Sequence, residues 1–187
     1  MKIALCTEIL YPIYGVEKRV YEMAKRLGKH GFDVTVYTSS AQKDVPDIKI
    51  KQVSNPTIIH PPKRNYFNCI NFTRKLIQVL LKDKYDIIDA NGHLSLIPCY
   101  IASRLKGKPI VATIHDLYLN EWKTMYSGKA AIFGPPFELS FSKLNYDEII
   151  TLNTTIKNKM IDLMKMKKDK IDIIPSGIDL NYLDKIT

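Results

Sequence analysis

The sequence contains little cysteine and no long apolar run. Its three cysteines, Cys6, Cys69 and Cys99, are odd in number and lack the CxxC spacing of a zinc site, so we expect neither a disulfide framework nor a bound metal. No stretch approaches the length of a membrane span, and the apolar residues that follow Lys2 are too few for a signal peptide. These absences together predict a protein of the cytoplasm, where cysteines stay reduced.

Acidic residues are also scarce. The chain has 19 Asp and Glu against 28 Lys and Arg, which gives a formal net charge of +9 and a pI near 9.3. Such an excess favours binding to nucleic acid, anionic lipid or phosphorylated small molecules, and charge alone does not choose among them. Two basic stretches, 63–84 and 157–170, suit cationic helices that lie on the inner face of an anionic membrane. A solvated charged face is the competing explanation of these stretches, and the one we favour.

The first forty residues alternate between strand-like and helix-like patterns. An apolar run from Lys2 to Thr7 breaks at a Pro/Gly loop, residues 11–15, and apolar residues then recur at helical spacing as far as Leu27. After a glycine-rich stop, a second run at 34–37 is rich in β-branched residues. Strand, helix and strand within forty residues predict a βαβ unit with two parallel strands.

The same alternation continues through the rest of the chain. We expect further strands at 48–53, 86–90, 110–114, 148–152 and 171–174, and further helices at 66–81, 94–105, 137–144 and 154–165. The strand at 48–53 reads as half exposed and near an edge. Prolines make 54–64 a loop, and 117–136 gives only weak, partly helical signals. The pattern predicts the α/β class: residues 1–174 form a doubly wound, Rossmann-like, mainly parallel sheet of about seven strands with helices on both faces.

Three loops follow strand ends and should share one rim of the sheet, where ligands of parallel sheets gather. They carry Gly15, then Asn91 and His93, then His115 and Asp116. A glycine before a helix lets backbone amides approach a ligand, but it also suits a tight turn. An imidazole at His115 can hydrogen-bond a ligand hydroxyl, or only the backbone at a strand end. Asp116 can instead cap a helix, and Asn91 and His93 can instead hold their loop.

Five segments resemble, in order and in spacing, the amino-terminal half of the family 4 retaining glycosyltransferases of GT-B fold. They are YPIYGVEKRVYEMAKRLGKHGFDVTVYT, DIIDANGHLSL, PIVATIHD, EIITLNTTIKNKM and KIDIIPSGIDLNYL. The resemblance covers essentially the whole chain. It departs from the family where Tyr14 replaces a usual glycine, where Asp89 and Asn91 replace a usual pair of histidines, and where Ser176 replaces an asparagine.

The resemblance implies transfer of a hexosyl group from a nucleotide-diphosphate sugar, a substrate and not a cofactor, to an acceptor hydroxyl of a glycan, a lipid-linked sugar or a phospholipid. It implies a catalytic role for His115. The residues implied to bind donor or acceptor are Gly15, Val16, Glu17, Asn91, His93 and Asp116. No metal is expected, because helix termini and basic side chains stabilise the leaving diphosphate.

Family members also carry a second Rossmann-like domain that supplies most of the nucleotide-sugar contacts. By resemblance, residues 175–187 begin the linker to that domain, which this sequence does not contain. We therefore expect the isolated domain to be inactive and the missing domain to be its partner.

Two other classes of function compete with this interpretation. A noncatalytic module that binds anionic lipid or nucleic acid explains the charge, and it predicts binding that falls steeply with salt. A dinucleotide oxidoreductase explains the fold, but Gly15 is not part of a GxGxxG motif. The transferase interpretation, without a nucleic-acid partner, is the one that the motifs favour.

Overall fold

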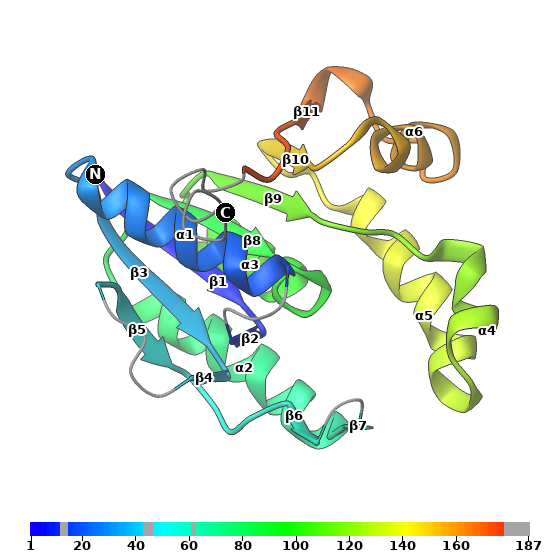
Figure 1. Ribbon diagram of the computed structural model, residues 1–187, viewed down its shortest axis with the longest axis horizontal. Coiled ribbons are helices and arrows are strands. Elements are labelled where there is room, and N and C mark those ends of the chain that lie inside the picture. Colours follow the sequence, from blue (N-terminus) through cyan, green and yellow to red (C-terminus); the bar gives the residue numbers. More distant parts are fainter. Residues whose placement is uncertain (12–14, 43–46, 61–62, 178–187) are drawn as a thin grey trace, which may run out of the picture.

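The computed structural model describes residues 1–11, 15–42, 47–60 and 63–177. Its centre is a seven-stranded sheet in the order β11-β10-β9-β8-β1-β3-β5, and every neighbouring pair is parallel (Figure 1). The strands are β1 (Lys2–Thr7), β3 (Asp33–Thr38), β5 (Lys49–Gln52), β8 (Ile87–Asn91), β9 (Ile110–Ile114), β10 (Glu148–Thr151) and β11 (Ile171–Ile173). The predicted doubly wound α/β fold is confirmed, and β5 is the predicted edge strand.

The strand order places a topological switch point beside β1. From β1 the chain moves outward through β3 to β5, and then returns to place β8 against the other side of β1. Thr7 at the end of β1 is in register with Asn91 at the end of β8, and Asn91 is in register with Thr113 of β9. The carboxyl ends of these three neighbouring strands therefore meet at the edge where open α/β sheets bind ligands.

Helices cover both faces of the sheet, as predicted. Helix α1 (Gly15–Lys29) packs Val20 and Ala24 on one face, and α2 (Tyr66–Lys82) and α3 (His93–Lys106) pack together on the other face. Successive side chains of a strand point to opposite faces of the sheet, so alternate residues of each strand pack in one core or in the other. The α1 core includes Ile3, Leu5, Val34 and Val36, whereas the α2 and α3 core includes Ala4, Cys6, Ile88 and Ala90.

The segment after β9 is more helical than the sequence indicates. It contains a 3-10 turn (Leu119–Glu121), α4 (Trp122–Met125) and α5 (Gly128–Ser140), which pack as a hairpin beside the sheet (Figure 1). The prediction placed the helix start at Phe137, because Pro135 and Pro136 normally end a helix. Here Gly134 lets the helix approach α4 closely: an added Cβ would lie 2.1 Å from the Trp122 ring. This packing stabilises a helix that sequence propensity disfavours.

Several shorter elements complete the fold. They are β2 (Ile9–Leu10), β4 (Ser40–Ala41), β6 (Ile58–His60), β7 (Lys63–Arg64), α6 (Thr154–Asp162) and the 3-10 turns Phe141–Lys143 and Lys168–Lys170. Strands β6 and β7 form a small antiparallel pair inside the segment 54–64, so the prediction of an irregular loop there is wrong in part. Helix α6 ends three residues before the predicted Lys165, which has a positive φ of 56°. A positive φ is incompatible with a continuing helix.

Two remaining predictions concern the membrane and the linker. Within the described parts of the chain, no helix combines the length and the apolar character that crossing a bilayer requires. Most of the expected linker, residues 178–187, lies outside the described residues. Pro175, just before them, lies next to α1, because its carbonyl oxygen accepts a hydrogen bond from Arg19 Nη1 at 3.3 Å.

Candidate functional site at the carboxyl edge of the sheet

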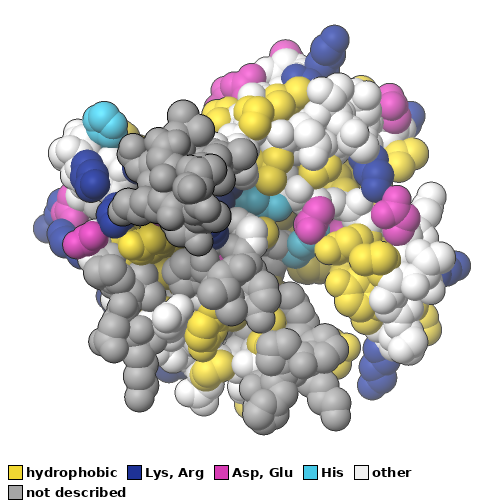
Figure 2. Space-filling view, viewed as in Figure 1, with side chains coloured by type: hydrophobic (Ala, Val, Ile, Leu, Met, Phe, Trp, Pro, Cys, Tyr) yellow, Lys and Arg dark blue, Asp and Glu magenta, His cyan; other side chains and the backbone are white. Residues whose placement is uncertain are grey.

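The three predicted loops lie at one edge of the sheet. Gly15 begins α1, Asn91 ends β8, His93 begins α3, and His115 with Asp116 follows β9. Strands β1, β8 and β9 are neighbours, so these positions border the same rim. Figure 2 shows histidine side chains at a hollow in this face, close to acidic side chains. The predicted convergence of the three loops is therefore present in the structure.

Asn91 and His115 form the centre of the rim. Asn91 is fully buried and His115 is 8% exposed. The Asn91 Nδ2 donates to the Asp89 carbonyl oxygen at 3.4 Å, which turns Asn91 Oδ1 toward His115 Nε2 at 3.2 Å. Because an amide oxygen only accepts, His115 Nε2 carries the proton and Nδ1 keeps its lone pair. The pair thus fixes one tautomer of the imidazole.

His115 is a neutral imidazole at neutral pH. Burial lowers its pKa to about 4, and the positive charges of Arg19 and His93 add to this shift. Loss of solvation disfavours the imidazolium form, and nearby cations disfavour it further. At pH 7 the side chain therefore offers a hydrogen-bond acceptor at Nδ1 and no charge.

Asp89 and Arg19 surround this pair, and the sequence analysis did not select either as a site residue. Asp89 is 7% exposed and accepts a 2.8 Å hydrogen bond from Thr113 Oγ1. Burial raises its pKa, while the bonds from Thr113 and Asn91 and the charge of Arg19 oppose this rise. The Nε of Arg19 is buried and has no hydrogen-bond partner among the described residues. The sequence could have indicated Arg19 as a site residue, because it lies one helical turn after Gly15.

His93 is held by a buried carboxylate that the sequence analysis also missed. Glu138 of α5 is fully buried, and its Oε1 lies 2.8 Å from His93 Nε2. The same carboxylate accepts the backbone N–H of Tyr118 at 3.1 Å and that of Leu119 at 2.6 Å. Burial acts to raise the pKa of Glu138, but these hydrogen bonds outweigh it and hold the pKa below its usual value. Glu138 thereby joins α5, the start of α3 and the loop after His115.

The other predicted residues border the rim more openly. Gly15 is exposed, with open space where a Cβ would stand, and Val16 is half-buried. Glu17 is also half-buried, and burial is the main cause of its raised pKa. Asp116 is exposed and accepts a 3.1 Å hydrogen bond from the Tyr118 hydroxyl, so it is not a helix cap. In the described residues, no three His, Cys, Asp or Glu side chains converge as a metal site requires.

Comparison with curated proteins finds relatives of about twice this length or more. The phosphatidylinositol N-acetylglucosaminyltransferase GPI3 subunit of Saccharomyces cerevisiae is 25% identical over an alignment of 187 positions, gaps included, that covers 94% of this chain and 39% of the relative. The D-inositol 3-phosphate glycosyltransferase of Acidothermus cellulolyticus is 23% identical over an alignment of 181 positions, gaps included, that covers 88% of this chain and 40% of the relative. The chain therefore spans about two fifths of these relatives.

Solved structures share the fold over nearly the whole chain. HepE of Anabaena, solved in complex with UDP-glucose, aligns with a TM-score of 0.69 at 18% identity and covers 97% of this chain and 45% of its own. Sucrose-phosphate synthase of Thermosynechococcus elongatus aligns with a TM-score of 0.71 at 18% identity and covers 96% of this chain and 49% of its own. The family described as Glycosyltransferase Family 4 matches residues 13–182, nearly the entire chain. The chain thus belongs to glycosyltransferase family 4.

Proposed function

We propose that this chain is the acceptor-side half of a retaining glycosyltransferase that moves a hexosyl group from a nucleotide-diphosphate sugar to an acceptor hydroxyl. The observation that carries the proposal is the buried Asn91–His115 pair at the switch point of the sheet. Membership of family 4 and coverage of less than half of the relatives support it. A domain matching the part of the relatives that this chain does not cover would supply most contacts to the nucleotide.

The proposed mechanism assigns His115 to the transferred sugar. Its Nδ1 lone pair accepts a hydrogen bond from a sugar hydroxyl, while Asn91 holds the ring in the required tautomer. His93 and Asp116, on the neighbouring loops, bind the acceptor. Both loops are joined through Glu138, whose hydrogen bonds reach His93 and Tyr118.

The leaving diphosphate is assigned to the start of α1. Gly15 and Val16 present backbone N–H groups there, and the helix N-terminus adds about half a positive charge. Arg19 contributes a cation from the same turn, with its buried Nε still without a partner in the described residues. Glu17, with its pKa raised by burial, borders the donor. These groups stabilise the developing charge of the leaving group without a cofactor.

The test is sugar transfer by the full polypeptide that contains residues 1–187. UDP-sugars are supplied as donors, with phosphatidylinositol and an inositol phosphate as acceptors. We expect His115→Ala to lower kcat/KM by about 10²–10³-fold, the effect of removing a group that interacts with the reacting sugar. His30→Ala, on the exposed turn after α1, is the matched control and should retain activity. Equal activity of the two variants would refute the assigned role.

The acceptor is further proposed to be lipid-borne, with the domain resting on an anionic membrane. Two helical segments with exposed apolar side chains flank the rim. Helix α2 begins at the carboxyl edge of the sheet, and the hairpin of α4 and α5 follows β9 at that edge (Figure 1). The most exposed apolar side chains of these segments are Tyr66, Phe67 and Ile70 of α2 and Ile132 and Phe133 of α5, at 62–79% exposure. Exposed Arg74, Lys75, Lys123 and Lys129 lie on the same helices or beside them. Apolar side chains with adjacent cations match the surface of an anionic bilayer.

Sedimentation with vesicles tests this surface. The 187-residue chain is mixed with vesicles of phosphatidylcholine and phosphatidylserine at moderate salt. We expect the double variant Phe67→Ser and Phe133→Ser to bind at least fivefold less than the parent chain. Leu105→Ser is the control, because Leu105 is 67% exposed but lies at the end of α3, away from the rim. Undiminished binding of the double variant would exclude these residues as the membrane surface.

A further inference from the structure

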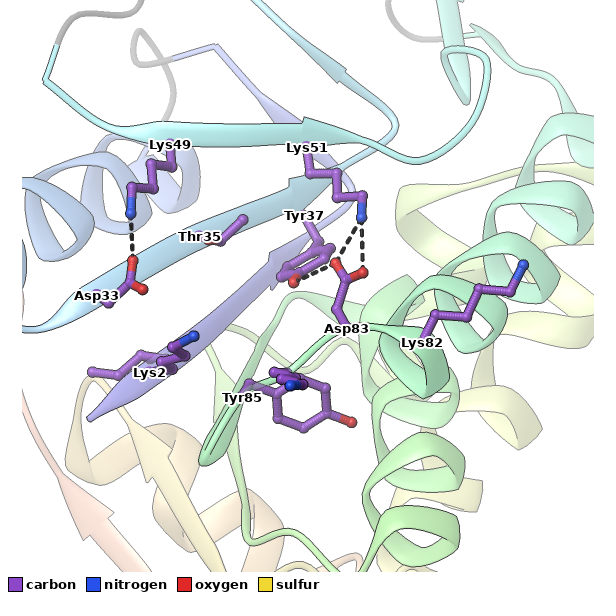
Figure 3. A pocket seen from close by; sticks show the side chains of 11 residues that line it. Lys2, Asp33, Thr35, Tyr37, Lys49, Lys51, Lys82, Asp83 and Tyr85 are labelled. Carbon is purple, nitrogen blue, oxygen red and sulfur yellow. Dashed lines mark hydrogen bonds and ion pairs between the residues drawn. The ribbon is translucent and has the colours of Figure 1, made fainter.

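Apart from the rim, the structure has a pocket on the sheet itself, over β1, β3 and β5 (Figure 3). It has a volume of about 460 Å³, within the range of small-molecule sites. Lys2 and Lys49, at the amino ends of β1 and β5, form part of its wall. At about 3.3 Å per residue, Lys2 is roughly 16 Å from Thr7 at the rim. The pocket is therefore separate from the proposed transfer site.

The two faces of the same strands differ sharply in character. Val34 and Val36 of β3 and Ile50 of β5 pack in the apolar core under α1. Their neighbours on the opposite face are polar: Asp33, Thr35, Lys49 and Lys51 line the pocket. Both faces of a parallel sheet are normally covered by helices and are therefore apolar. This corner of the sheet is instead open and charged, which is the arrangement of a binding surface.

The carboxylates of the pocket are already paired. Asp33 lies 2.5 Å from the Lys49 ammonium, and Asp83 lies 2.7 Å from that of Lys51. Asp83 also accepts a 2.9 Å hydrogen bond from the Tyr37 hydroxyl, as the dashed lines in Figure 3 show. Five lysines and two aspartates line the pocket. Pairing therefore leaves an excess of positive charge on its wall.

Two of the remaining lysines supply that charge. The ammonium groups of Lys2 and Lys84 have no ion-pair or hydrogen-bond partner among the described residues, and both residues line the pocket. Lys82 extends away from the other labelled side chains (Figure 3). Asp86, which does not line the pocket, accepts the backbone N–H of Lys2 at 2.7 Å. An anion that enters the pocket would meet Lys84 and Lys2, neither of which is held in an ion pair by a described residue, although the Lys2 charge also acts on Asp33.

We infer that this pocket binds a small phosphorylated polyol, such as a sugar phosphate, at a site distinct from the donor diphosphate. A phosphate accepts hydrogen bonds from several ammonium groups at once, and lysines bind it as point charges. The hydroxyls of a sugar match the polar wall. Tyr37 and Tyr85 are 3% and 4% exposed, so no ring face is open for stacking on a nucleobase. The ligand is thus a sugar phosphate and not a nucleotide.

Calorimetric titration of the 187-residue chain with glucose 6-phosphate and with inorganic phosphate tests the inference. We expect saturable binding of glucose 6-phosphate that is at least tenfold weaker in the double variant Lys2→Gln and Lys84→Gln. The control is Lys143→Gln with Lys168→Gln, which removes the same charge from exposed positions elsewhere. The double variant Lys2→Arg and Lys84→Arg should retain binding, and the circular dichroism of all variants should match that of the parent.

Three results would overturn the inference: no saturable binding, equal weakening in the test and control variants, or equal affinity for inorganic phosphate and the sugar phosphate. The last would indicate a bare anion site. A parallel measurement uses vesicles that contain phosphatidylinositol phosphate. If the chain binds these vesicles but not free glucose 6-phosphate, the ligand is a lipid headgroup and not a free sugar phosphate. The inference does not depend on the proposed sugar transfer, because the pocket lies apart from the rim. The variant His115→Ala should therefore bind glucose 6-phosphate as the parent chain does.

Discussion

The rim and the basic pocket are two polar regions built on the same strands, and they differ in how water reaches them. At the rim, Asp89, Asn91, His115 and Glu138 are all less than 9% exposed, and each is held by a hydrogen bond. At the pocket, the lysines and Asp33 are exposed, Asp83 is half-buried, and each carboxylate is paired with a lysine. Buried polar groups must be satisfied by the protein, whereas exposed ones are satisfied by water.

The causes of the pKa shifts differ between the buried groups of the rim and the exposed Asp33–Lys49 pair of the pocket. Burial dominates at the rim, where it lowers the pKa of His115 and raises that of Asp89. At the pocket the Lys49 partner is the main cause of the lowered pKa of Asp33. Burial therefore sets the protonation of His115 and Asp89 at the rim, whereas the exposed Asp33–Lys49 pair of the pocket is open to screening by salt. The four changes below test this distinction.

Removal of the Glu138 carboxylate should have the largest effect on stability. Glu138→Ala leaves His93 Nε2 and two backbone N–H groups without their acceptor in a buried place. Loss of one partner of such a buried network costs about 3–5 kcal/mol. Urea unfolding followed by circular dichroism measures this change. Glu148→Ala, at an exposed position of β10, should stay within about 0.5 kcal/mol. A loss below 1 kcal/mol at Glu138 would contradict a rim fixed by burial.

Acid should weaken the fold through His115 at a higher pH than through the pocket carboxylates Asp33 and Asp83, whose pKa values lie below their usual range. The unfolded chain takes up a proton near pH 6.5, and the folded chain takes it up only near pH 4. The free energy of unfolding therefore falls as pH drops from 6.5 to 4, by about 3 kcal/mol at most. Above pH 6.5 His115 does not change the free energy of unfolding with pH.

The difference between the parent chain and His115→Gln isolates this contribution from that of the carboxylates. Urea unfolding at pH 7, 6, 5 and 4.5 measures it, and the variant should show a flatter profile. The groups that face His115 in the described structure are Asn91, Arg19 and His93, and all are retained in the variant. Identical pH profiles would show that His115 is not desolvated. Glu138 acts at lower pH, since its lowered pKa means that its stabilising charge is lost only in more acidic solution.

Asn91→Leu should have a smaller effect on stability but a distinct effect on the imidazole. The change removes the acceptor of His115 Nε2 and the donor to the Asp89 carbonyl, at a cost of about 1–2 kcal/mol. Nitrogen NMR of labelled histidine measures the tautomer directly. We expect the Nε2-protonated form alone in the parent chain and a mixture of both tautomers in the variant. An unchanged tautomer would show that Asn91 does not select it.

Sequence patterns were sufficient for the sheet and for the position of the rim. The period-two and helical patterns locate all seven strands, and parallel strands necessarily bring the loops at Gly15, Asn91 and His115 to one edge. They were not sufficient for Glu138, because its partners come from α3 and from the loop after β9, far away in the sequence. The helix that carries it contains two prolines and packs closely on Trp122 at Gly134. The hydrogen bonds of Glu138 and the helix that carries it both depend on tertiary contacts, and helix propensity does not include such contacts.

The smallest effect is expected at the pocket, where Lys51→Gln breaks the ion pair with Asp83. The two side chains are 45% and 24% exposed, so the pair contributes at most about 0.5–1 kcal/mol after solvent screening. Asp83 keeps its hydrogen bond from the Tyr37 hydroxyl in the variant. The measurement is urea unfolding in 0.1 M and in 1 M NaCl, where the screening length falls from about 10 Å to about 3 Å. We expect the difference between parent and variant to shrink at high salt, whereas the cost of Glu138→Ala should persist, because salt does not screen a buried group that water cannot reach.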